Sequence, residues 1–80
     1  MNEKQIKLAR HALGLPQPNK TSYRNRFYVS GGNVTDWLEM KSNGHADNVY
    51  EHYWLTPAGA ALALLPGEKL DREDFPKGAK

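Results

Sequence analysis

The run from Tyr53 to Leu62, YWLTPAGAAL, constrains the fold more than any other part of this sequence. It opens with two aromatic residues and a leucine, which favour a half-buried strand. Thr56 can cap a following helix with its hydroxyl, and Pro57 suits the first helical position, where its missing N–H costs no hydrogen bond. The residue before a proline also prefers extended backbone. The run therefore predicts a strand that passes directly into a helix over residues 57–65.

Local signals also organise the rest of the chain. Asn2 can cap a first helix over residues 3–13, and Gly14 can end it in left-handed backbone. Further along we expect, in order, a strand over residues 26–30, a helix over 34–43, a turn over 45–48, and a strand over 49–55 that pairs with 26–30. The sequence thus predicts an α+β domain over residues 1–66, ordered helix, strand, helix, strand hairpin, helix. Residues 67–80 are expected to form a loosely ordered tail, with Phe75 able to dock back on the domain.

Apolar spacing predicts which face of each helix is buried. For the first helix and its cap these residues are Ile6, Leu8, Ala9, Ala12, Leu13 and Leu15. For the second they are Val34, Trp37 and Leu38, and for the third Ala58, Ala61, Leu62 and Leu65. Trp37 and Trp54 are both expected in the core because of their size.

The composition limits the class of protein. The chain has 80 residues and no cysteine, which excludes disulfides and thiolate zinc sites and favours a cytoplasmic location. No apolar run is long enough to cross a membrane. The net charge is +2, but residues 1–32 hold six cations and one anion, whereas residues 33–65 hold one cation and four anions. A basic first half favours attraction to phosphate or to an acidic protein surface, although small domains also show such asymmetry by chance.

No motif in the sequence predicts catalysis. The serines lie outside any G-x-S-x-G nucleophile motif, and His11, His45 and His52 match no metal-ligand spacing. Gly31-Gly32 precedes a predicted helix, but the lysine and the remaining residues of a phosphate-binding loop are missing. We therefore expect a binding protein rather than an enzyme, with no cofactor and no metal.

Residues 20–28, KTSYRNRFY, are the best candidate for a binding surface because three cations lie among three aromatic residues. Arginine can grip phosphate with two parallel hydrogen bonds, and Tyr23 or Tyr28 could stack on an exposed base. Together with the basic ridge of the first helix, the predicted contact residues are Lys7, Arg10, Lys20, Tyr23, Arg24 and Arg26. The same pattern also fits a solvated helix face and an edge strand that arginines keep soluble, and both interpretations stay open.

The predicted order also resembles a known family of folds. A helix that ends at Gly44, two strands, and then the Leu-Thr-Pro-Ala-Gly step of residues 55–59 resemble the second half of a winged-helix domain. The resemblance implies a winged-helix-like fold, and such domains often bind DNA. Residues 9–15, 22–27 and 54–60 together resemble a group of short uncharacterised phage and prophage proteins, from which no function can be transferred. In contrast to a true winged helix, only one helix precedes residues 34–43, and those residues are net acidic.

Two functional hypotheses follow. In the first, the chain is a small phage-type nucleic-acid-binding protein, accessory or regulatory, that works in the host cytoplasm through its basic surface. In the second, it is a protein-binding module that inhibits or redirects a host machine, for example an anti-CRISPR-like or polymerase-binding inhibitor. There the same basic surface would meet an acidic host protein or fill a nucleic-acid channel.

Overall fold

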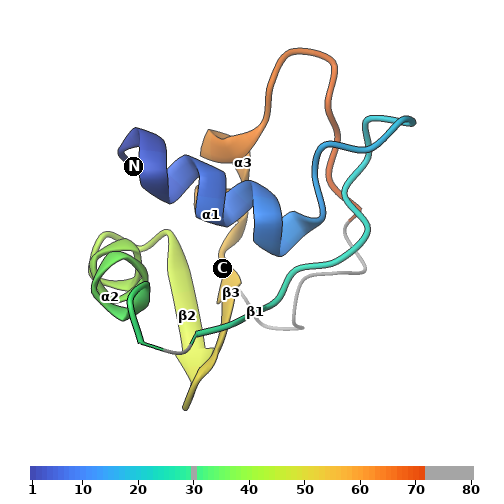
Figure 1. Ribbon diagram of the computed structural model, residues 1–80. Coiled ribbons are helices and arrows are strands. Elements are labelled where there is room, and N and C mark those ends of the chain that lie inside the picture. Colours follow the sequence, from blue (N-terminus) through green and yellow to red (C-terminus); the bar gives the residue numbers. More distant parts are fainter. Residues whose placement is uncertain (30, 72–80) are drawn as a thin grey trace.

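The computed structural model, which describes residues 1–29 and 31–71, has three helices and three strands in this part of the chain (Figure 1). They are α1 (Glu3–Leu13), β1 (Phe27–Tyr28), α2 (Val34–Ser42), β2 (Ala46–Val49), β3 (His52–Leu55) and α3 (Pro57–Ala63). This α+β architecture and its winged-helix-like order confirm the fold predicted from the sequence. None of the helices in the described ranges has the length and hydropathy that a membrane span requires.

The strands form one antiparallel sheet in the order β1-β3-β2. Phe27 lies opposite Tyr53, so the predicted pairing of the first strand with residues 49–55 is confirmed. The predicted turn over residues 45–48 is wrong, because Ala46 pairs with Leu55 and the hairpin turns later, at Tyr50 and Glu51. Ala46 is buried, and this burial holds the segment in the sheet. Tyr50 has a φ of 52°, so it supplies the left-handed backbone of the turn without a glycine.

Helix α1 begins and ends where its local signals predict. The Asn2 side chain accepts a hydrogen bond from the Gln5 N–H at 2.8 Å, and the Gln5 side chain accepts one from the Asn2 N–H at 3.1 Å. This reciprocal pair is a capping box. At the other end Gly14 has a φ of 77°, and the Leu15 N–H donates to the Arg10 carbonyl at 2.9 Å. Leu15 is buried beneath the cap, as predicted.

The core lies between the sheet and the three helices, with the ring of Trp37 near its centre. This ring lies 5.2 Å from the ring of Phe27 and 5.6 Å from that of Tyr53, between centroids. With Trp37 so placed, Met40 on the next turn is also buried, whereas Val34 and Leu38 are 40% and 49% exposed. The predicted buried face of α2 is therefore wrong at these two residues. Trp54, expected in the core, is only partly buried.

Helix α3 starts at Thr56, whose hydroxyl accepts a hydrogen bond from the Gly59 N–H at 3.2 Å. The face predicted to be buried is the wrong one, because the helix buries Gly59, Ala60 and Ala63 instead. A Cβ at position 59 would overlap the His45 carbonyl, so the helix approaches the start of the hairpin through its smallest residue. This contact turns the larger apolar residues of the predicted face towards solvent, including Leu62 at 50% exposed.

The segment after α3 returns to the body of the domain (Figure 1). The Lys69 N–H donates to the Lys20 carbonyl at 2.8 Å, and the Ser22 N–H donates to the Lys69 carbonyl at 2.9 Å. The Asp71 N–H donates to the buried Ser22 hydroxyl, also at 2.9 Å. Residues 67–80 were predicted to form a loosely ordered tail, and for residues 68–71 this prediction is wrong. The predicted docking of Phe75 lies outside the described residues.

Candidate binding cleft

Residues 23–26 are seated on the C-terminal end of α1. The last carbonyls of a helix have no partner within the helix, and here the neighbouring segment supplies donors. The Tyr23 N–H donates to the Leu13 carbonyl at 3.2 Å, and the Arg26 N–H donates to the Ala12 carbonyl at 3.1 Å. The Arg24 guanidinium donates twice to the His11 carbonyl, at 2.7 and 3.2 Å. The helix end therefore fixes where the two arginines of this segment lie.

Asn25 ties the same segment to the sheet. Its side-chain amide donates to the Leu55 carbonyl at 2.9 Å, and its side-chain oxygen accepts from the Leu55 N–H at 2.8 Å. The side chain thus replaces a neighbouring strand at the end of β3. Because Arg24 and Arg26 flank Asn25, both are attached to a segment held at two places.

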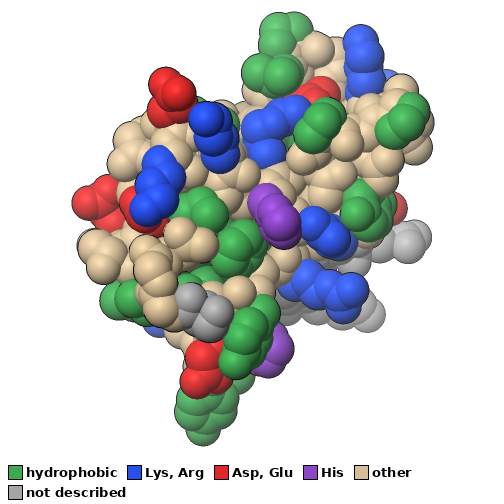
Figure 2. All heavy atoms as spheres, viewed as in Figure 1, with side chains coloured by type: hydrophobic (Ala, Val, Ile, Leu, Met, Phe, Trp, Pro, Cys, Tyr) green, Lys and Arg blue, Asp and Glu red, His purple; other side chains and the backbone are tan. Residues whose placement is uncertain are grey.

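An open cleft of about 460 Å³ lies where this segment meets the edge strand β1 and the end of α1. In Figure 2, blue lysine and arginine side chains gather on the face that carries α1 and the segment after it, around a purple histidine. The residues that line the cleft are two arginines, two histidines and two other aromatics: His11, Arg24, Arg26, Phe27, Tyr28 and His52. The cleft therefore combines positive charge with aromatic surface.

The two arginines differ in how much of their guanidinium is free. Arg24 uses its Nε and one terminal nitrogen on the His11 carbonyl, and its guanidinium carbon lies 5.3 Å from the centroid of the Tyr23 ring. Arg26 is exposed, and its side chain makes no hydrogen bond or ion pair with any residue in 1–29 or 31–71. Since a guanidinium carries five N–H donors, Arg26 presents a full set and Arg24 a partial one.

Four aromatic rings complete the lining of the cleft. The His11 and Phe27 rings meet edge to face, with centroids 5.2 Å apart, and Phe27 continues into the core. The Tyr28 and His52 rings lie 5.3 Å apart across the β1–β3 pair. Tyr28 is 62% exposed, so it offers aromatic surface to a ligand.

Tyr23, a predicted contact residue, packs mainly against other parts of the protein. Its ring lies where a Cβ on Gly14 would be, so the glycine makes room for it, and Arg24 lies over the ring. Although Tyr23 is 53% exposed, it is not among the residues that line the cleft. The arrangement stacks Tyr23 against the protein's own arginine rather than leaving it free.

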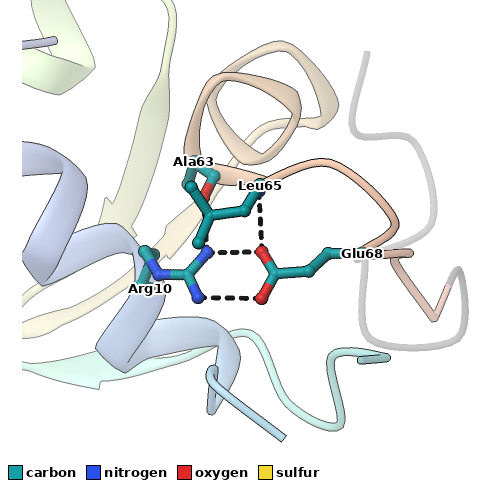
Figure 3. A network of polar contacts seen from close by, with 4 residues as sticks. All are labelled: Arg10, Ala63, Leu65 and Glu68. Atoms are coloured by element: carbon teal, nitrogen blue, oxygen red, sulfur yellow. Dashed lines mark hydrogen bonds and ion pairs between the residues drawn. The ribbon is translucent and has the colours of Figure 1, made fainter. Parts of the chain in front are cut away.

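Arg10 does not belong to the predicted basic surface. Its guanidinium and the Glu68 carboxylate form two parallel hydrogen bonds, the Nη2–Oε2 bond being 2.8 Å long, and Nη1 also donates to the Ala63 carbonyl at 2.9 Å (Figure 3). The side chains of Arg10 and Glu68 are only 14% and 7% exposed. The hydrogen bonds from Arg10 lower the pKa of Glu68 to about 2, and the same pairing raises the pKa of Arg10. Arg10 is therefore a structural cation that holds residues 65–68 against α1.

Lys7 and Lys20, the other predicted contacts, lie outside the cleft. Lys7 is exposed on α1, one turn before His11, so it extends the positive surface along the helix. Lys20 lies beside Gly67 and close enough to Glu68 for its charge to help lower the pKa of that carboxyl. Of the six predicted residues, only Arg24 and Arg26 line the cleft.

Among the other lining residues, Phe27 and Tyr28 belong to the predicted surface over residues 20–28, whereas no sequence pattern marked His11 or His52. His11 and His52 are 41 positions apart in the chain, and only the packing of α1 against the β1 edge brings them to one cleft. Within the described ranges, no group of three or more His, Cys, Asp or Glu side chains could hold a metal ion.

Comparisons of the chain with family models, with curated proteins and with solved structures give no significant match. The case for a function therefore depends on the cleft itself.

Proposed function

We propose that this protein binds nucleic acid through the cleft lined by Arg24 and Arg26. The observation that carries the proposal is the combination of two arginines, two histidines and exposed aromatic surface in one open cleft. Arginine recognises phosphate by charge and by its forked donors, whereas exposed aromatic rings suit the faces of bases. An accessory or regulatory role of the phage type in a host cytoplasm fits such binding and belongs to the same proposal.

The proposed mode differs from that of a typical winged helix, in which a helix before the wing enters the major groove. Helix α2 occupies that place, but it carries Asp36 and Glu39 against Lys41 and exposes Val34 and Leu38. The hairpin that would form the wing turns at Tyr50 and Glu51, without a cation at its tip. Phosphates are therefore expected at the cleft and along the Lys7 side of α1 rather than at α2.

The test is fluorescence anisotropy of labelled duplex and single-stranded oligonucleotides across a salt series. We expect micromolar binding to at least one probe, with an affinity that falls steeply as salt rises because phosphate contacts release counterions. Arg24→Glu with Arg26→Glu should abolish this binding while the circular dichroism spectrum keeps its folded form.

The matched control is Lys4→Glu with Lys41→Glu, which changes the net charge equally but lies outside the cleft. These lysines pair with Asp36 and Asp47 on the surface. Equal loss of binding in both double variants would mean that overall charge, not the cleft, attracts the nucleic acid. Absence of binding to every probe at low salt would overturn the proposed function.

A protein-binding module that inhibits a host machine is the second candidate. It is favoured by Val34 and Leu38, which lie one turn apart on α2 and are both exposed, because neighbouring exposed apolar side chains often mark a protein interface. If nucleic acid does not bind, Val34→Ser with Leu38→Ser tests this candidate. The paired substitutions should then remove a host protein that the unchanged chain captures.

A further inference from the structure

Tyr28 is one of three exposed tyrosines in this domain, and it is the one that lines the cleft. Its backbone pairs with His52 in the sheet, but its ring is 62% exposed at the cleft. Phe27, the preceding residue, also borders the cleft, but its ring packs against that of Trp37 in the core. The fold therefore has its aromatic anchor in Phe27 and does not use most of the Tyr28 ring for packing.

We propose that Tyr28 is a stacking platform for an unpaired base, so that the ligand of the cleft is single-stranded nucleic acid. This inference rests on the proposed nucleic-acid binding and specifies its ligand. Every base has a flat π-face, so stacking on tyrosine gives affinity with little dependence on sequence. The His52 ring lies 5.3 Å from that of Tyr28 at an interplanar angle of 59°, so it borders the platform and does not extend its flat face.

The neighbouring arginine supports the assignment. Arg26 immediately precedes β1 and is two positions from Tyr28, a separation of at most about 7 Å along the backbone. Both line the cleft. A backbone phosphate on the Arg26 guanidinium can therefore belong to the same nucleotide as a base on Tyr28.

The shape of the cleft favours a single strand over a duplex. The cleft is open and has a volume of about 460 Å³, which is large enough to admit an unpaired base. In a duplex the faces of the bases are stacked on one another, and a base must be flipped out at a free-energy cost before it can enter such a pocket. An unpaired strand offers its bases without that cost.

The first experiment compares three labelled probes with the unchanged protein by fluorescence anisotropy at one low salt concentration. The probes are an oligothymidylate of about 12 nucleotides, a strand of equal length in which most nucleotides are abasic, and a duplex of equal length. We expect the oligothymidylate to bind about tenfold more tightly than either of the other two. The abasic strand keeps every phosphate, so its weaker binding isolates the contribution of the bases.

The second experiment uses three variants. Tyr28→Ala should weaken oligothymidylate binding about tenfold without changing its salt dependence, and Tyr28→Phe should bind as the unchanged protein does. Tyr50→Ala is the matched control, because Tyr50 is an 84% exposed tyrosine that does not line the cleft, and it should have no effect. Circular dichroism confirms that each variant is folded.

The outcomes separate the two proposals. No binding to any probe overturns the proposed function, and the stacking platform with it. Salt-dependent binding that is equal for all three probes leaves nucleic-acid binding in place and overturns the platform. Equal loss of affinity in Tyr28→Ala and Tyr50→Ala also overturns it, because stacking would then not be confined to the cleft. If Tyr28→Ala does not fold, the probe comparison still tests whether the ligand is single-stranded and whether its bases contribute to binding.

Discussion

Arg10 and Arg26 are the same residue type in the same basic half of the chain, yet the structure uses them in opposite ways. Arg10 is largely covered, with 14% of its side chain exposed, and its guanidinium donates to Glu68 and the Ala63 carbonyl. Arg26 is exposed, and its guanidinium has no hydrogen bond or ion pair among the described residues. The difference shows that charge in a sequence locates candidates only, whereas burial and partners decide which cation holds the fold and which is available to a ligand.

Loss of the Arg10 guanidinium should have the largest effect on stability. In Arg10→Met the Glu68 carboxylate loses its two charged hydrogen bonds, so we expect the free energy of unfolding to fall by about 2 kcal/mol. Arg26→Met should change it by less than about 0.5 kcal/mol, because the side chain is on the surface. Urea unfolding followed by circular dichroism measures both values.

The double variant Arg10→Met with Glu68→Met is the control for this comparison. It removes both charges, so it should recover much of the stability that the single variant loses. Equal stability losses in Arg10→Met and Arg26→Met would contradict the structural role assigned to Arg10.

Acid should weaken the Arg10–Glu68 pair, because it protonates the Glu68 carboxylate. The pKa of Glu68 is lowered from 4.5 to about 2 in the folded protein, so the unfolded chain binds the proton more readily. The stability that this pair contributes is therefore complete above pH 4.5 and is lost as the pH falls towards 2. The slope from this one group is at most about 1.4 kcal/mol per pH unit. Unfolding free energies of the unchanged protein and of Glu68→Gln should show this slope only in the former.

Arg24 is intermediate between Arg10 and Arg26 in the number of its partners. Its loss should therefore have a small but measurable effect on the free energy of unfolding. Arg24→Ala removes two hydrogen bonds to the His11 carbonyl, so we expect a loss of about 1 kcal/mol, against almost none for Arg26→Ala. Both variants should weaken nucleic-acid binding. In Arg26→Ala the fall of log affinity with log salt concentration should also become less steep, by the amount expected for the loss of about one phosphate contact. Thermal unfolding and salt titrations of the two variants measure these differences. Equal stability with unequal binding would show that Arg24 does not support the end of α1.

The sequence by itself determined the features whose causes lie within a few residues. The capping box of α1, the left-handed Gly14 and the Thr56-Pro57 start of α3 each depend on hydrogen bonds or backbone angles between near neighbours. For this reason the bounds of α1 and the order of elements could be predicted. The pairing of β1 with β3 was also predictable, because both segments are short runs rich in aromatic residues.

Only the tertiary structure decided what depends on residues far apart in the chain. The close approach of Gly59 to the His45 carbonyl determines which face of α3 is buried, and this face differs from the one that the apolar spacing predicts. Arg10 is not part of the predicted basic surface because it pairs with Glu68, 58 positions away. His11 and His52 joined Arg26 in one cleft because α1 packs beside the sheet edge. Such contacts arise from the close packing of whole elements, which no local pattern encodes.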